Sequence, residues 1–283
     1  MRQIFLLHAD THGGHWLGLL NPKTKLAGMN DSGEEIEWTP KLSATQRWLW
    51  RWYTKFIGQV VDLAGDDEIV VCHVGDITHG TRFGRLVPGI QPGDQVSIAT
   101  WNLKPLTDLQ NVKQVILVTG TEVHVPNSIE ATISRIVRLE TGKRVQTLHQ
   151  GRVDLGREWL DVAHHGAHPG TRDWLRGNIA TIYCKTRVYE DRRLGVVPAV
   201  LYARGHYHTL VHVTVNETWK GVDEIHHLLI VPSMSGPTRH SIKSTQSTPS
   251  LTVGMVALEV IDGRLHDIHK FKRERDIRVK VKI

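Results

Sequence analysis

Short apolar runs that end at polar clusters recur along the chain and predict its buried strands. Gln3–His8 is the first, and Glu68–His73 and Lys113–Val118 repeat the pattern before glycine-containing loops. Trp159–His164 and Val200–Arg204 are similar, and each again runs into histidines. We therefore expect a sheet whose strands deliver polar side chains at their ends.

Alternation of apolar and polar positions predicts half-exposed strands in the C-terminal part of the chain. This pattern occurs at Leu210–Val215, His227–Val231 and Leu251–Ile261. The last stretch, Lys270–Ile283, alternates cationic residues with valine and isoleucine, which is typical of an edge strand protected by its charges.

Two segments have helical spacing. Leu42–Leu63 begins at Ser43 with Gln46 three residues further on, which is the sequence of a capping box, and Gly65 is placed to end the helix. Apolar residues recur at helical spacing in Asn127–Thr141 as well. The mixture of strands and helices predicts an α/β fold.

The remaining segments are predicted to be loops. Asn21–Pro40 and Ser233–Ser250 are rich in glycine, proline and small polar residues. No linker or internal repeat divides the chain. We therefore expect a single domain over residues 1–283, with strands at about 251–283 completing the sheet.

The composition is ordinary for a globular protein except for its 18 histidines. The net charge of +6 permits an anionic partner without identifying one. No apolar run is long enough for a membrane helix, and the N-terminal segment lacks the apolar stretch of a signal peptide. Cys72 and Cys184 lie in apolar runs and are expected to be buried thiols, which fits a cytoplasmic location.

An aromatic segment near the N-terminus has two interpretations. Trp48, Trp52 and Phe56 are four residues apart, so they form one helical face that is expected to pack into the core. Aromatic residues interleaved with cations are also used to stack the bases of single-stranded nucleic acid. That interpretation requires Trp50 and Arg51 to be exposed.

Metal-ligating residue types follow five of the expected strands: Asp10 with His12, Asp76, His124, His164 with His165, and His206 with His208. Functional groups of α/β sheets gather beyond the carboxyl ends of the strands. Asp10 and His12 point the same way if the backbone there is extended. The set exceeds the needs of one four-coordinate ion, and carboxylate with imidazole suits Mn, Fe or Zn, so two divalent ions are expected.

The ordered motifs resemble those of the calcineurin-like metallophosphoesterase superfamily, which run D-x-H, G-D-x-x-x-x-G, G-N-H-[DE], H and G-H-x-H. The matching positions here are Asp10–His12, Gly75–Gly80, Gly120–His124, His164 or His165, and Gly205–His208. The resemblance implies a four-layer α/β/β/α sandwich with mixed sheets and a dinuclear metal centre.

The resemblance also implies a role for each matching residue. Asp10, His12 and His208 would hold the first metal. Asp76 would bridge the two metals, and His206 with the middle histidine would hold the second.

The third motif departs from the family pattern. Thr121 stands where the family has an asparagine ligand, and His124 comes two residues late, in a G-T-x-x-H variant that resembles phage-encoded members. Thr121, Glu122 or water could complete the second metal's shell. The middle histidine is also open, because His164 and His165 each fit one spacing before the glycine, and the other would line the substrate cleft.

These expectations together predict a metal-dependent hydrolase of phosphate monoesters or diesters. A hydroxide bridging the two ions would attack phosphorus in line, while His124 stabilises the phosphate or protonates the leaving oxygen. Residues in or beside the motif loops are candidates for substrate contact: His15, His79, Arg82 and Arg204.

Two alternatives remain at the level of the sequence. The first is a nuclease or nucleotide phosphodiesterase, which the net charge and the aromatic segment favour. The second is a catalytically weak metal-binding scaffold for a protein partner, which the missing asparagine favours.

Overall fold

Two β-sheets form the centre of the computed structural model, which describes residues 1–82, 85–125, 129–166, 168, 175, 177–238, 250–279 and 281. The six-stranded sheet has the order β13 (Arg264–Asp276), β12 (Ser250–Ile261), β1 (Arg2–His8), β4 (Glu68–His73), β5 (Val112–Val118) and β6 (Arg144–Leu148). Strands β1, β4, β5 and β6 run parallel, and β12 and β13 are antiparallel to their neighbours.

The second sheet is also mixed. Its five strands have the order β10 (Val211–Trp219), β11 (Val222–Ile230), β9 (Leu201–Arg204), β8 (Trp159–Ala163) and β7 (Gln150–Asp154). Strands β8, β9 and β11 run parallel, whereas β10 and β7 pair antiparallel at the two edges.

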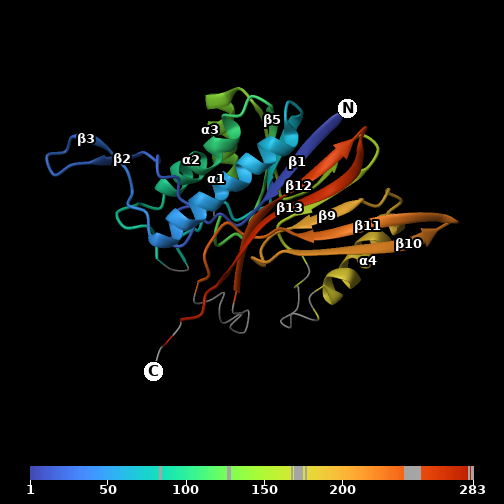
Figure 1. Ribbon diagram of the computed structural model, residues 1–283. Coiled ribbons are helices and arrows are strands. Elements are labelled where there is room, and N and C mark those ends of the chain that lie inside the picture. The colour runs from blue at the N-terminus through green and yellow to red at the C-terminus, as the bar shows by residue number, and fades with distance from the viewer. Residues whose placement is uncertain are drawn as a thin grey trace.

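Helices cover both outer faces of this pair of sheets (Figure 1). On one side lie α1 (Ala44–Ala64), α2 (Asp94–Thr107) and α3 (Ile129–Thr141), and on the other lies α4 (Asn178–Arg193). The expected four-layer α/β/β/α sandwich with mixed sheets is therefore confirmed.

Burial on both faces explains the unbroken apolar run Ile4–Leu7 within β1. Ile4 and Leu6 pack with the helices α1 to α3, whereas Phe5 and Leu7 pack into the core between the two sheets. A parallel strand buried on both faces is apolar at every position. A third core, which includes Cys184, lies between the five-stranded sheet and α4.

Helix α1 begins as predicted, but its buried face differs from the expectation. Ser43 and Gln46 form the capping box in full, and the helix ends at Gly65. The core face carries Leu49, Tyr53, Phe56, Ile57 and Val60, rather than the two tryptophans expected beside Phe56. Phe56 is thus correctly placed in the core, whereas Trp48 and Trp52 lie at its edge and the centre of the buried face is formed by other residues.

Trp48 and Trp52 are only partly buried at the edge of this core, and they also pack against the C-terminal strand. The guanidinium groups of Arg273 and Arg275 lie over the rings of Trp52 and Trp48, at 4.9 and 5.5 Å from the ring centroids. Trp50 is half-buried and stacks on the ring of Tyr53 at 5.5 Å.

Several elements differ from the sequence expectations. The predicted loop at Asn21–Pro40 contains a short hairpin, β2 (Leu26–Met29) and β3 (Glu35–Trp38), which projects from the body in Figure 1. Helices α2 and α4 and strands β6 and β7 were not predicted. The expected start of the helix at Asn127 and much of the loop Ser233–Ser250 lie outside the described residues.

The described helices include none that could cross a membrane, because each is too short or too polar. Cys72 and Cys184 are free and buried, as expected.

Candidate metal centre

The candidate ligands gather where strands of both sheets end. Asp10 follows β1, Asp76 follows β4 and Thr121 follows β5 in the six-stranded sheet. His164 follows β8 and His206 follows β9 in the five-stranded sheet. The strands within each group run parallel, so their carboxyl ends lie at the same edge.

The backbone at these positions is not extended. Five of the seven described non-glycine residues with positive φ are candidate ligands, namely Asp10 (52°), His12 (44°), Asp76 (51°), His206 (73°) and His208 (50°). The expectation that an extended backbone aligns Asp10 with His12 is therefore wrong. Each such conformation costs on the order of 1–3 kcal/mol and persists only where the surrounding structure enforces it.

Hydrogen bonds between the loops enforce these conformations. The amide of Asp10 donates to the carbonyl oxygen of Gly75 at 3.0 Å. The amide of His12 likewise donates to the carbonyl oxygen of Asp76 at 3.0 Å. Asp10 Oδ2 in turn accepts the amide hydrogen of His206 at 3.1 Å, which joins the two sheets.

The carboxylate of Asp76 lies at the centre of the site. Its Oδ1 accepts the amide hydrogen of Thr121 at 2.6 Å. Its Oδ2 lies 3.2 Å from His164 Nε2, 3.9 Å from His12 Nε2 and 4.0 Å from His124 Nε2. One oxygen of this buried carboxylate is thus surrounded by imidazole nitrogens from three separate loops.

One group of ligand atoms lies on the His12 side of Asp76. His12 Nε2 is 3.2 Å from His208 Nε2, and Asp10 Oδ1 is 3.3 Å from the same nitrogen. Ligand atoms bound at about 2.0–2.1 Å to a tetrahedral ion stand about 3.4 Å apart. Asp10, His12 and His208 could therefore hold one metal ion.

A second group lies on the other side and comprises His164, His165 and His206, whose ligand atoms could also hold an ion. The Nδ1 of His164 donates to the carbonyl oxygen of Val74 at 2.8 Å, which leaves Nε2 as its ligand atom. Thr121 Oγ1 lies 3.4 Å from His206 Nδ1 and 3.5 Å from His165 Nε2. The structure therefore brings both middle histidines and Thr121 to this group.

The electrostatics of the site favour a cation. Burial alone would raise the pKa of Asp76, but the charge and hydrogen bond of His164 hold it well below its usual range. Burial would lower the pKa of His164, but Asp76 and Asp10 raise it to about 9, so His164 carries a proton beside these carboxylates that a bound metal ion would displace. Burial lowers the pKa of His206 to about 4, so this imidazole is neutral at pH 7, as a metal ligand must be.

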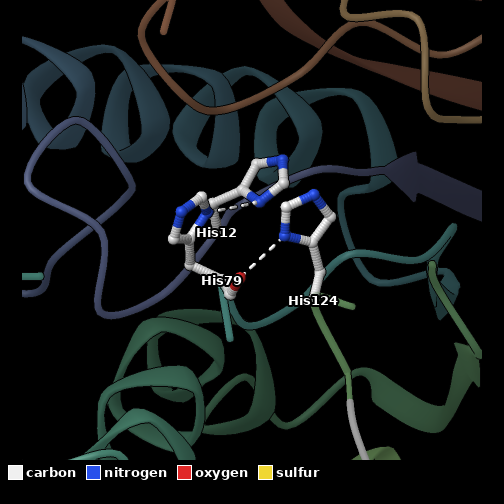
Figure 2. A group of neighbouring side chains, drawn as sticks. All are labelled: His12, His79 and His124. Carbon is white, nitrogen blue, oxygen red and sulfur yellow. Dashed lines mark hydrogen bonds between the residues drawn. The ribbon is translucent and has the colours of Figure 1, made fainter. Parts of the chain in front are cut away.

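His79 connects two of these rings (Figure 2). Its Nδ1 lies 3.4 Å from Nδ1 of His12, and its main-chain carbonyl oxygen accepts a hydrogen bond from His124 Nδ1 at 2.7 Å. Because a carbonyl only accepts, this bond puts a proton on His124 Nδ1 and turns Nε2 toward Asp76. Figure 2 shows the three rings facing one another around this connection.

The other expected contact residues are not all brought to the centre. Arg204 is completely buried and pairs with Asp161 at 2.6 Å, so it supports the core of the sheet and is not available to a substrate. His15 is buried against the ring of His79 at 4.1 Å. Glu122 and Arg82 are both exposed, and Glu122 belongs to none of the ligand groups of the described residues.

Two supporting residues were missed from the sequence. Gln95 Oε1 accepts the amide hydrogens of His79 and Gly80 at 3.0 and 2.8 Å, and Glu130 Oε1 accepts that of Gly120 at 3.0 Å. Gln95 was missed because its helix, α2, was not predicted. Glu130 was detectable in principle, since it is an acid on the buried face of a predicted helix.

The residues present fit a bound metal. Asp10 Oδ1 is buried and accepts no hydrogen bond among the described residues, and its neighbour His208 Nε2 at 3.3 Å is itself a candidate ligand, so the oxygen is costly to bury unless a cation meets it. The donors are two buried carboxylates and several imidazoles, which is a set suited to Zn, Fe or Mn.

Comparisons with known proteins assign no family. No family model and no curated protein matches the chain. Among solved structures it is similar to an archaeal phosphodiesterase, with 12% identity over 97% of this chain and 99% of the other and a TM-score of 0.41. A protein of unknown function from Aquifex aeolicus matches with 13% identity, 72% and 78% coverage and a TM-score of 0.31. Vps29 of Chaetomium thermophilum matches with 9% identity, 98% and 97% coverage and a TM-score of 0.33. At these identities and scores, the likenesses carry neither fold nor function over to the chain.

Proposed function

We propose that the chain is a metal-dependent phosphoesterase of the calcineurin-like metallophosphoesterase superfamily, in a G-T-x-x-H variant like that of phage-encoded members. The substrate is a phosphate monoester or diester, and two divalent ions are held at Asp10, His12 and His208 on one side and at His164 and His206 on the other.

One observation carries the proposal. Asp76 Oδ2 lies between the ligand group of Asp10, His12 and His208 and that of His164, His165 and His206, 3.9 Å from His12 Nε2 and 3.2 Å from His164 Nε2. A carboxylate in this position is the bridge that a two-metal site requires. An ion pair with a purely structural role would require only one of these contacts, such as that between Asp76 and His164.

Bound metal ions would supply a water of lowered pKa and positive charge for the phosphoryl oxygens. The protein's own contribution lies in orientation and proton transfer. His124 directs Nε2 into the site because its Nδ1 is held by the carbonyl oxygen of His79. In its imidazolium form His124 would give the proton of Nε2 to the leaving oxygen and keep the one on Nδ1, and the exposed Arg82 is a candidate contact for the phosphate.

The test compares the wild-type protein with Asp76→Ala on bis(p-nitrophenyl) phosphate and p-nitrophenyl phosphate in Mn²⁺, Co²⁺ or Zn²⁺. Loss of the bridge should lower kcat/KM by at least about 1,000-fold. Asp66→Ala, at an exposed aspartate, is the matched control and should leave activity unchanged. Equal hydrolysis by the wild type and Asp76→Ala would refute the assignment, and metal binding without turnover of any ester would favour the scaffold alternative.

No contact among the described residues favours a nuclease over a general phosphoesterase. The rings of Trp48 and Trp52 are engaged by Arg275 and Arg273 of the same chain. Of the two residues that a base-stacking platform needs exposed, Arg51 is exposed but Trp50 is half-buried.

A further inference from the structure

We propose that His165 is a ligand of the second metal ion and completes that site in place of the amide ligand that Thr121 cannot supply. The inference rests on the proposed function, and it names the residue that makes the second site of this chain different. His164 and His165 are then both ligands of the same metal ion, rather than alternatives for one ligand position.

The spacing around Thr121 supports a shared ion. Its Oγ1 lies 3.4 Å from Asp76 Oδ2, 3.5 Å from His165 Nε2 and 3.4 Å from His206 Nδ1. Hydrogen bonds of a hydroxyl are usually 2.5–3.0 Å long, and its one proton satisfies one acceptor at a time. Ligands that share a tetrahedral ion stand about 3.4 Å apart. Thr121 Oγ1 lies at about this distance from each of the three ligand atoms.

The two neighbouring histidines reach the same point from different directions. Their rings are nearly perpendicular at 4.9 Å, and the ring of His206 lies 5.2 Å from His164 and 4.7 Å from His165. Gly166 follows at once, where a Cβ would meet the side chain of Arg204 at 2.6 Å. The glycine thus lets the chain turn closely against β9 directly after His165.

A third imidazole changes the chemistry of the site without changing its charge. A neutral nitrogen ligand takes the place of a neutral amide oxygen, so the net charge of the ligand set is the same. Nitrogen donors favour Zn²⁺, Co²⁺ and Fe²⁺, whereas oxygen donors favour Mn²⁺ and Mg²⁺. We therefore expect the second site to prefer Co²⁺ or Zn²⁺ over Mn²⁺.

Three variants test this role. His165→Ala removes the ligand, and the double variant Thr121→Asn with His165→Ala offers an amide oxygen at position 121 in its place. His168→Ala is the matched control, because His168 is an exposed histidine of the same segment that contacts the ring of Tyr207. Each metal-depleted protein is titrated with Co²⁺ and followed by visible absorption, and bound metal is counted by elemental analysis after gel filtration.

The wild type and His168→Ala should bind two equivalents of Co²⁺. His165→Ala should keep one tight equivalent and bind the second at least about 100-fold more weakly. The double variant should regain the second equivalent with a preference shifted toward Mn²⁺. Two equivalents of wild-type affinity in His165→Ala, or fewer than two in the wild type, would overturn the proposal. Since metal is counted directly, a wild type that binds two ions without hydrolysing any ester would refute the proposed function alone.

Discussion

At the scale of single residues, His8 shows how burial without a partner couples the fold to pH. It is completely buried on β1 beside His73 on β4, with the two rings in edge contact at 4.6 Å. Neither ring nitrogen of His8 has a hydrogen-bond partner among the described residues. Burial lowers the pKa of His8 to about 3.

The pKa of His8 predicts a loss of stability in acid. In the unfolded chain the group binds a proton below pH of about 6.5, but in the folded protein only below about 3. Its neutral form thus favours folding above pH 6.5, and this advantage is lost as the pH falls toward 3, by about 2 kcal/mol at pH 5. His8→Leu should flatten the decline in the free energy of unfolding between pH 6.5 and 4, measured by urea denaturation. The exposed His266→Leu is the control, and a slope unchanged by His8→Leu would contradict the account.

At the scale of elements, the strand ends are shaped by glycines as much as by ligands. A Cβ at Gly120 would collide with the main chain and carboxylate of Asp76, and one at Gly205 would meet the carbonyl oxygen of Val74 at 2.5 Å. Because glycine has no Cβ at these two positions, the loops after β4, β5 and β9 can approach one another this closely. The close approach explains how ligands from different strands reach one centre.

Gly120→Ala should displace Asp76 and impair metal binding as well as folding. We expect at least about 100-fold weaker metal binding and a loss of about 1–3 kcal/mol in the free energy of unfolding. Gly58→Ala is the matched control, because nothing lies within 4 Å of a Cβ there and α1 should gain about 0.5–1 kcal/mol from the change. Calorimetric titration with Mn²⁺ and thermal unfolding measure both effects, and wild-type affinity in Gly120→Ala would contradict this account of the loops.

The elements that could be predicted from the sequence are those with an unambiguous signal. β1 contains the unbroken apolar run Ile4–Leu7, and α1 has a complete capping box. Helix α2 was missed because it mixes polar and apolar residues and contains Pro105. Helix α4 buries a narrow line of small residues, Ala180, Cys184 and Val188, and so lacks a strong apolar stripe.

The candidate site was predictable in its residues but not in its geometry. The order of the motifs pointed to Asp10, Asp76 and His206. In the structure Asp10 and Asp76 share one ligand group, and the amide of His206 donates to Asp10 Oδ2. Their left-handed backbone conformations leave no mark in the sequence, because aspartate and histidine replace the glycine that usually signals them. The burial of Arg204 against Asp161 depends on tertiary packing and could not be predicted from the sequence either.

At the scale of the whole molecule, the centre joins the two halves of the sandwich. Asp10 and Asp76 follow strands of the six-stranded sheet, whereas His164 and His206 follow strands of the five-stranded sheet. An ion bound between them therefore links the two sheets at one end.

Metal binding should accordingly stabilise the protein as a unit. At a free metal concentration of about 100 times Kd, linkage adds about 2.7 kcal/mol to the free energy of unfolding, which raises Tm by about 5 °C. Differential scanning calorimetry with Mn²⁺ or Zn²⁺, followed by excess EDTA, measures this shift and its reversal. Asp76→Ala should show a much smaller shift, and an equal shift in both proteins would place the binding elsewhere.

The central claim is that Asp76 lies between two cations, and anomalous scattering from crystals grown with Mn²⁺ or Zn²⁺ tests it most directly. The account predicts two peaks about 3.5–4 Å apart that flank Asp76 Oδ2, one beside His12 and His208 and the other beside His164 and His206. Anomalous maps with no peak within about 2.5 Å of Asp76 at saturating metal would contradict it.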